Sequence, residues 1–156
     1  MTPVKIEEVK QSERHQYINF LLLADESEAV VQKYIHDGDM FSIHYENKVA
    51  GVMIFTFHSD QVVELKNIAL DSRYRGNGLG TFVVTEAFKI YKRRGKRKMV
   101  VGTANSSIGN LIFYQKLGFR MVEIKRDFFK AYPEPIIESG IRALDMVMFE
   151  KTLTEN

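Results

Sequence analysis

The most regular pattern of apolar and polar positions lies between Val62 and Tyr91. An extended apolar segment reaches Leu70 and is followed by a short polar turn and the glycine-rich run Arg75-Gly76-Asn77-Gly78-Leu79-Gly80. Apolar residues then recur at intervals of three and four, which predicts an amphipathic helix. The apolar side of this helix comprises Leu79, Phe82, Val83, Ala87, Ile90 and Tyr91.

A glycine loop that opens a helix is suited to binding anions. The first backbone N–H groups of a helix have no partner within it and lie at the positive end of its dipole. Gly76, Gly78 and Gly80 allow backbone angles closed to other residues and let a phosphate approach the amides. Two common nucleotide-binding loops do not fit, because Gly-Lys followed by Ser or Thr is absent and Thr81 stands where a dinucleotide fingerprint needs its third glycine.

The strand before the loop changes its apolar face part-way along. Val63 and Leu65 share one face of an extended chain, whereas Ile68 and Leu70 would share the other. This change predicts a β-bulge, with an extra residue near position 66 or 67. A bulge there would splay the strand from its neighbour.

Alternating and helical patterns also predict the other elements. Ser27 would cap the helix expected at 27–36, and Ser106 or Ser107 would cap the helix expected at 108–117, which Gly118 would end. The expected strands are 4–9, 41–45, 49–58, 99–103, 119–126 and 141–153, and the expected remaining helices are 11–24, 27–36 and 108–117.

Length and charge limit the class of protein. With 156 residues, 45% of them hydrophobic, we expect one domain over residues 1–156. The net charge of +2 comes from mixed signs, which argues against a nucleic-acid partner, and the basic run 92–98 is interpreted as a helix C-terminus. The start MTPVKIEEVK is charged where a signal peptide is apolar, and no apolar run reaches the ~20 residues of a membrane span. We expect a cytoplasmic protein with no membrane partner.

Two kinds of catalytic site are not supported by the residue types. The chain has no cysteine, and therefore no thiol nucleophile and no disulfide. The four histidines lack the spacing of paired metal ligands, so no metal is predicted; they are His15, His36, His44 and His58.

Two motifs together resemble the GNAT superfamily of N-acetyltransferases. The first is Asn67-Ile68-Ala69-Leu70 followed by the glycine-rich run, in which Arg75, Gly78 and Gly80 fit the acetyl-coenzyme A signature. The second is the stretch NLIFYQKLGF at 110–119. The chain departs from the usual pattern at Asp71-Ser72, where most relatives have a proline, and at Asn110, where most have an alanine.

The resemblance implies an α/β (α+β) fold of the GNAT type. Its single mixed, mostly antiparallel sheet would have six to seven strands and about four flanking helices, and strands 4 and 5 would splay apart to admit acetyl-CoA. The implied reaction is direct attack of a primary amine, on a small molecule or peptide, in a ternary complex with acetyl-CoA and without a metal. The alternative is a non-catalytic acyl-CoA-binding sensor of the same fold. Homodimers are common in the superfamily, so a second copy of the chain is a candidate partner. The implied cofactor-binding residues are Ile68, Ala69, Leu70, Arg75, Gly76, Asn77, Gly78, Leu79, Gly80, Thr81, Asn105 and Asn110.

The reaction needs a neutral amine, a donor that stabilises the developing oxyanion, and a group that protonates or hydrogen-bonds the leaving thiolate. A lysine-like amine of pKa ~10.4 is neutral in only about one molecule in 2,500 at pH 7. Glu64 is the candidate base, directly or through water, although a salt-bridged residue at a sheet edge explains it equally well. A backbone N–H near Ile68, freed by the bulge, would stabilise the oxyanion. The resemblance places Tyr114 beside the cofactor sulfur, and its alternative is a core aromatic next to Phe113.

The resemblance implies that the connection 127–140 borders the acceptor site. Several acidic side chains in it or just after it would suit a cationic acceptor, while Lys130 and Arg142 weaken that interpretation, and a solvated loop is the alternative. The acidic residues are Asp127, Glu134, Glu138 and Asp145.

Overall fold

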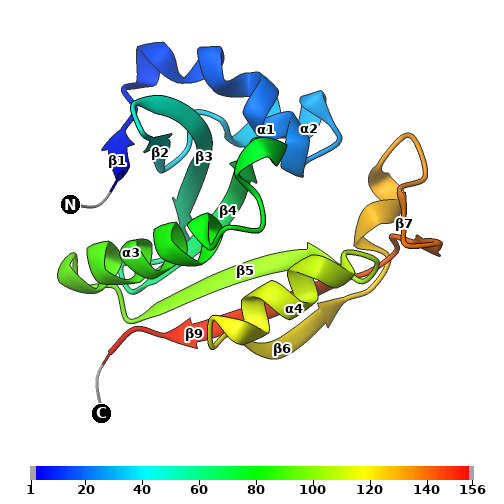
Figure 1. Ribbon diagram of the computed structural model, residues 1–156. Helices are drawn as coiled ribbons and strands as arrows, with labels where there is room; N and C mark the ends of the chain where they lie inside the picture. Colours follow the sequence, from blue (N-terminus) through cyan, green and yellow to red (C-terminus); the bar gives the residue numbers. More distant parts are fainter. Residues whose placement is uncertain (1–2, 155–156) are drawn as a thin grey trace.

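The computed structural model describes residues 3–154 and is organised around one seven-stranded sheet (Figure 1). The strand order is β1-β2-β3-β4-β5-β9-β6, and β4 and β5 are its parallel neighbours while the other five pairs are antiparallel. This confirms the predicted mixed, mostly antiparallel sheet. The strands are β1 Val4–Glu8, β2 Asp39–Tyr45, β3 Lys48–Phe57, β4 Val62–Leu70, β5 Lys98–Ala104, β6 Arg120–Lys125 and β9 Met146–Thr152.

Helices cover both faces of the sheet because each face carries its own apolar cluster. Leu21 of α1 and Val31 of α2 pack with Val52 and Ala69 on one face, and the buried side of α3 packs on the other. None of the helices in the described chain has the length and apolar content that would let it cross a membrane. The α-helices are α1 Ile18–Ala24, α2 Glu28–Tyr34, α3 Leu79–Arg93 and α4 Ile108–Lys116, and the 3-10 helices are η1 Gln11–Tyr17, η2 Ser72–Tyr74 and η3 Phe128–Ala131.

The predicted bulge lies in β4 at Lys66. Asn67 pairs with Ile54 of β3, and Leu65 pairs with the next residue, Phe55, so Lys66 has no partner in this ladder. The parallel pairing of β4 with β5 comprises Val62 to Glu64, at the beginning of both strands. Beyond it the two strands diverge, as Figure 1 shows. Both the bulge and the splayed strands 4 and 5 are thereby confirmed.

The glycine loop leads into α3 as predicted, but the buried face of this helix is rotated. Gly78 is the N-cap with φ of 82°, and Gly95 follows the helix with φ of 87°. Val84 is fully buried, whereas Phe82 is 36% exposed. The helix therefore packs on the row through 79, 83, 84, 87 and 91, and Phe82 lies at the boundary of that face.

The C-terminal strand predicted from Ile141 is interrupted. Ile141–Arg142 forms the short strand β8, paired with β7 at Ile137–Glu138, and β9 begins at Met146. The backbone N–H groups of Leu144 and Asp145 donate to Oδ1 of Asn105 at 2.8 and 3.0 Å. Because these amides bond a side chain, they are withdrawn from a strand ladder and the chain turns here.

Candidate active site

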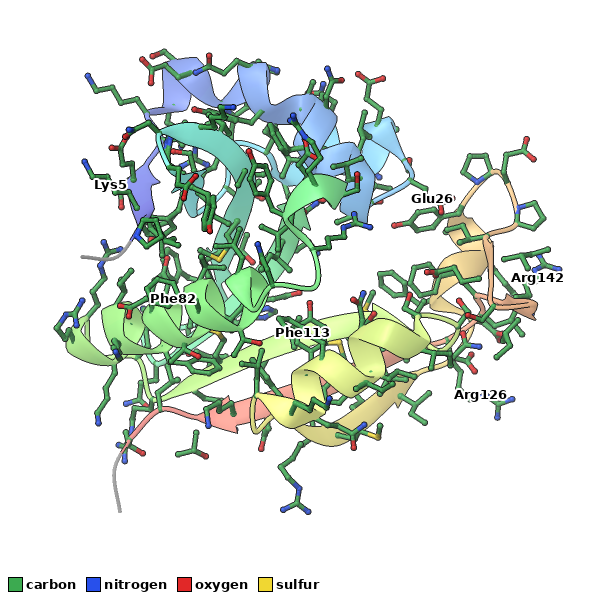
Figure 2. All side chains as sticks on the ribbon, viewed as in Figure 1. Lys5, Glu26, Phe82, Phe113, Arg126 and Arg142 are labelled. Carbon is green, nitrogen blue, oxygen red and sulfur yellow. The ribbon has the colours of Figure 1, made fainter. Side chains whose placement is uncertain are left out.

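A cavity of about 860 Å³ opens where β4 and β5 diverge. It is bordered by the connection from α1 to α2, the bulge of β4, the glycine loop, β5, the start of α4 and the segment 129–138 (the strap). Figure 2 shows Glu26 and the strap on opposite sides of its open end, and Phe113 between α3 and α4. The lining residues predicted as site residues are Ile68, Leu70, Arg75, Gly76, Gly78, Gly80, Thr81, Asn110 and Tyr114.

The glycine loop presents unpaired backbone donors to this cavity. Five N–H groups, those of residues 76, 77, 78, 80 and 81, have no hydrogen-bond acceptor within residues 3–154. A Cβ built on Gly76 or Gly78 would meet no atom within 4 Å, so the space above these amides is open. Asn77 acts within the loop, because its Oδ1 accepts from the Leu79 N–H at 3.1 Å. The arrangement fits a phosphate group held by main-chain donors.

The edge of β4 supplies a second set of main-chain groups. The Asp71 N–H donates to the Ala50 carbonyl of the β3 side at 2.8 Å. Backbone directions alternate along a strand, so Ala69 faces β3 and the N–H and C=O groups of Ile68 and Leu70 face the opening. Nε of Arg75 donates to the Leu70 carbonyl at 3.3 Å, in agreement with this direction. An extended amide-containing arm could therefore pair along β4.

Four predicted cofactor-binding residues lie outside the cavity lining, namely Ala69, Asn77, Leu79 and Asn105. Ala69 and Leu79 are buried in the two apolar clusters, on opposite faces of the sheet. Asn105 uses both ends of its amide on the backbone of 142–145, since Nδ2 also donates to the Arg142 carbonyl at 3.1 Å. Asn110 does line the cavity, and its Nδ2 donates to Oγ1 of Thr103 at 3.3 Å.

Tyr114 is a buried phenol at the cavity wall. It is 4% exposed, and its ring contacts Phe113, Phe119 and Phe149 at centroid distances of 5.2, 5.6 and 5.9 Å. Its hydroxyl makes no hydrogen bond with any residue of the described chain, 3–154. Burial raises the pKa of the Tyr114 phenol, so it stays protonated in the neutral range. The ring of Tyr114 is thus a core aromatic, as the alternative interpretation has it, while its hydroxyl lies at the cavity without a partner in residues 3–154.

Glu64 lies at the point where β4 and β5 separate, but outside the cavity lining. Its Oε1 is 2.5 Å from Nε2 of His58, and its side chain is 13% exposed. The contact with His58 therefore agrees with the alternative interpretation of Glu64 as a salt-bridged residue. A catalytic role for Glu64 stays a prediction and would require water between its carboxylate and the amine.

The predicted serine caps of α4 differ from the structure. Ser107 occupies the N-cap position without a side-chain bond to the helix amides. Instead, the hydroxyls of Ser106 and Ser107 donate to Oε1 of Glu138 at 3.2 and 2.8 Å. The Glu138 carboxylate, brought by β7, thus ties the strap to the start of α4, where the helix dipole favours a negative charge.

The open end of the cavity carries polar residues whose grouping no sequence pattern predicts. Asp25 and Glu26 of the α1–α2 connection, Asn67 of β4 and Tyr132 of the strap all line it. Of the acidic residues expected near the acceptor, Glu138 lines the cavity and the other three do not. Asp25 and Tyr132 are 107 residues apart along the chain, so no local sequence pattern could have linked them.

Comparisons with known proteins agree with this geometry. The model of the Acetyltransferase (GNAT) family matches residues 6–119. The chain belongs to this family. A curated relative, the uncharacterized N-acetyltransferase YvbK of Bacillus subtilis, is 36% identical over 141 residues, which are 90% of this chain and 91% of the relative. This GNAT member is accordingly an acyltransferase of the N-acetyltransferase class.

Solved structures extend the similarity to nearly the whole chain. A GNAT family acetyltransferase from Elizabethkingia anophelis with acetyl-CoA bound has a TM-score of 0.91 at 33% identity, covering 97% of this GNAT chain and 99% of its own. A Bacillus subtilis acetyltransferase in complex with CoA has a TM-score of 0.89 at 35% identity, with coverage of 97% and 99%. An IAA acetyltransferase from Bacillus cereus has a TM-score of 0.88 at 35% identity, with coverage of 96% and 99%.

Proposed function

We propose that this GNAT protein transfers an acetyl group from acetyl-CoA to a primary amine by direct attack within a ternary complex. The observation that carries the proposal is the single cavity that joins the unpaired amides of the glycine loop to the polar open end, past the Tyr114 hydroxyl. Bound acetyl-CoA and CoA in two similar structures support the choice of donor. Acetyl-CoA supplies an activated thioester: transfer forms a C–N bond, breaks the C–S bond and moves one proton from the amine to the sulfur.

The residues of the chain fit the parts of this donor. The amides of residues 76, 78, 80 and 81 would hold the pyrophosphate, because they are free and Gly76 and Gly78 leave open space above them. The main-chain groups of Ile68 and Leu70 would bond the amide-containing arm along the edge of β4. The Ile68 N–H would also be the donor to the developing oxyanion. Asn110 would lie against the donor from the side of α4.

Tyr114 is proposed to donate a hydrogen bond to the departing sulfur. An ordinary phenol of pKa ~10 giving its proton to a thiolate of ~8.5 is already uphill by about 2 kcal/mol. The raised pKa of Tyr114 makes full proton transfer less favourable still. Stabilisation of the thiolate by a hydrogen bond, rather than protonation by Tyr114, is therefore the step we assign to this hydroxyl.

Release of CoA thiol from acetyl-CoA over a panel of amines tests the proposal. The panel comprises monoamines, diamines and polyamines, amino acids, aminoglycosides and lysine peptides, and acetyl-CoA binding is followed in parallel by calorimetry. We expect amine-dependent release whose kcat/KM rises with pH as the amine loses its proton. Tight binding of acetyl-CoA with no release above the hydrolytic background for any amine would instead support a non-catalytic acyl-CoA sensor.

The homodimer stays a prediction, and the edge strand β6 is the surface that favours it. β6 is the last strand in the sheet order, and its Met121, Val122 and Ile124 are 53%, 52% and 61% exposed. A strand edge with exposed apolar side chains can pair with a second copy.

A further inference from the structure

Asn67 carries a buried oxygen without a hydrogen-bond donor. The residue is 5% exposed and is among those that line the cavity, and its Nδ2 donates to the Leu21 carbonyl at 3.1 Å and to the Tyr34 hydroxyl at 2.9 Å. A carbonyl can only accept, so the bond to Leu21 fixes which end of the amide is nitrogen. Oδ1 then has no donor within residues 3–154. A buried acceptor left without a donor is costly, and a ligand N–H would satisfy it.

Tyr34 connects Asn67 to a carboxylate at the open end. The Tyr34 hydroxyl donates to Oδ2 of Asp25 at 3.1 Å, and the Tyr132 hydroxyl of the strap donates to Oδ1 at 3.2 Å. Burial first, and the nearby Asp25 as well, raise the pKa of both phenols, so both hydroxyls keep their protons and donate to the Asp25 side chain. Asp25 is partly exposed and lines the cavity together with the next residue, Glu26.

Within residues 3–154, the carboxylates of this end, Asp25 and Glu26, have no basic partner in an ion pair. Lys66 also lines the cavity, but its Nζ lies 5.4 Å from the centroid of the Tyr34 ring, in a cation–π contact rather than on a carboxylate. The open end therefore offers two carboxylates to a cationic ligand.

The two kinds of acceptor atom suit two different nitrogens. The attacking amine must be neutral, and a neutral amide oxygen accepts its N–H without the strong preference for the protonated form that a carboxylate imposes. A carboxylate stabilises an ammonium, which cannot attack. The Asn67 oxygen thus suits the reacting nitrogen, and the pair Asp25 and Glu26 suits a second nitrogen that stays charged.

We propose that the acceptor is a diamine or polyamine, whose reacting amine hydrogen-bonds Oδ1 of Asn67 and whose second, charged amine binds Asp25 and Glu26. This inference rests on the proposed acetyl transfer. Acetyl transfer takes one proton from the amine bound at Asn67, and the second amine keeps its charge throughout. Asp25 and Glu26 are specificity-determining residues in this assignment, and Asn67 is a binding residue for the reacting group.

The test compares 1,4-diaminobutane with butylamine, which has the same carbon chain and one amine. In the unaltered protein, kcat/KM for the diamine should exceed that for butylamine by about a hundredfold, as expected for two charge contacts of about tenfold each. Asp25→Asn should raise KM for the diamine about tenfold and leave kcat and the KM for acetyl-CoA unchanged. Glu26→Gln should act in the same direction. Glu134→Gln, an exposed strap carboxylate outside the cavity lining, is the charge-matched control and should change neither constant.

The role of Asn67 is distinguished from that of the carboxylates by the effect of each substitution on the monoamine. Asn67→Ala should lower kcat/KM for butylamine and the diamine alike, whereas Asp25→Asn should affect the diamine alone. If Asn67→Ala fails to fold, the Asp25 result decides. Equal kcat/KM values for butylamine and the diamine, or an unchanged diamine KM in Asp25→Asn, would overturn the inference while leaving acetyl transfer intact. Absence of thiol release with every amine would instead defeat the proposed function itself.

Discussion

Replacing Gly78 by glutamate should abolish acetyl-CoA binding. Gly78 has φ of 82° and stands at the N-cap of α3, and a side chain there would enter open space above the free amides. Glutamate would therefore place its carboxylate where the pyrophosphate is proposed to bind. A like charge at such a position costs several kcal/mol, so we expect the affinity measured by calorimetry to fall by at least about a hundredfold.

Two further variants separate charge from backbone strain. Gly95 has φ of 87° and equally open surroundings, but it follows the C-terminal end of α3. Gly95→Glu should therefore carry a similar conformational cost and keep the affinity for acetyl-CoA. Gly78→Gln has the same shape as the test variant without its charge, and it should lose less affinity. Affinity retained in Gly78→Glu would remove the phosphate from this loop.

Tyr114→Phe should lower turnover by about a hundredfold and leave the affinity for acetyl-CoA nearly unchanged. The substitution removes only the hydroxyl, which has no hydrogen-bond partner in the described chain, and the ring contacts with Phe113, Phe119 and Phe149 remain. The free energy of unfolding should consequently change little. Steady-state kinetics with the best amine of the panel gives the effect on kcat.

Tyr91 provides the matched control for loss of a buried phenol. Its hydroxyl donates to Oδ2 of Asp39 at 2.7 Å, and it lies outside the cavity lining. Tyr91→Phe should therefore reduce stability, because a buried hydrogen bond is lost, while kcat stays the same. An unchanged kcat in Tyr114→Phe would take Tyr114 out of the chemistry and leave it as a core aromatic.

The parts of the site that lie close together in the sequence could be predicted from it. The change of apolar face around Lys66 predicted the bulge because strand side chains alternate strictly, so one extra residue must shift the pattern. The spacing of Gly76, Gly78 and Gly80 predicted a loop of open amides before α3 for a similarly local reason. In both cases the backbone requirement falls within a few residues.

The remaining parts depend on contacts between distant segments. Ser107 is of a residue type that caps helices, but its hydroxyl instead donates a hydrogen bond to Glu138, which lies 31 positions further along the chain. Asn105 is predicted to bind the cofactor, but the backbone of 142–145 occupies both ends of its amide. The strap also brings Tyr132 to Asp25, which completes the polar open end. Tertiary packing, rather than local propensity, determines the hydrogen-bond partners of such side chains.

Hydrogen–deuterium exchange with and without acetyl-CoA tests most directly whether the opening between β4 and β5 is the donor site. We expect acetyl-CoA to slow exchange at the amides of Ile68, Leu70 and residues 76, 78, 80 and 81, because these N–H groups face the cavity without internal acceptors. The edge strand β6 should exchange at the same rate in both samples. Saturating acetyl-CoA that leaves residues 66–81 unprotected, or that protects another surface, would contradict the assignment.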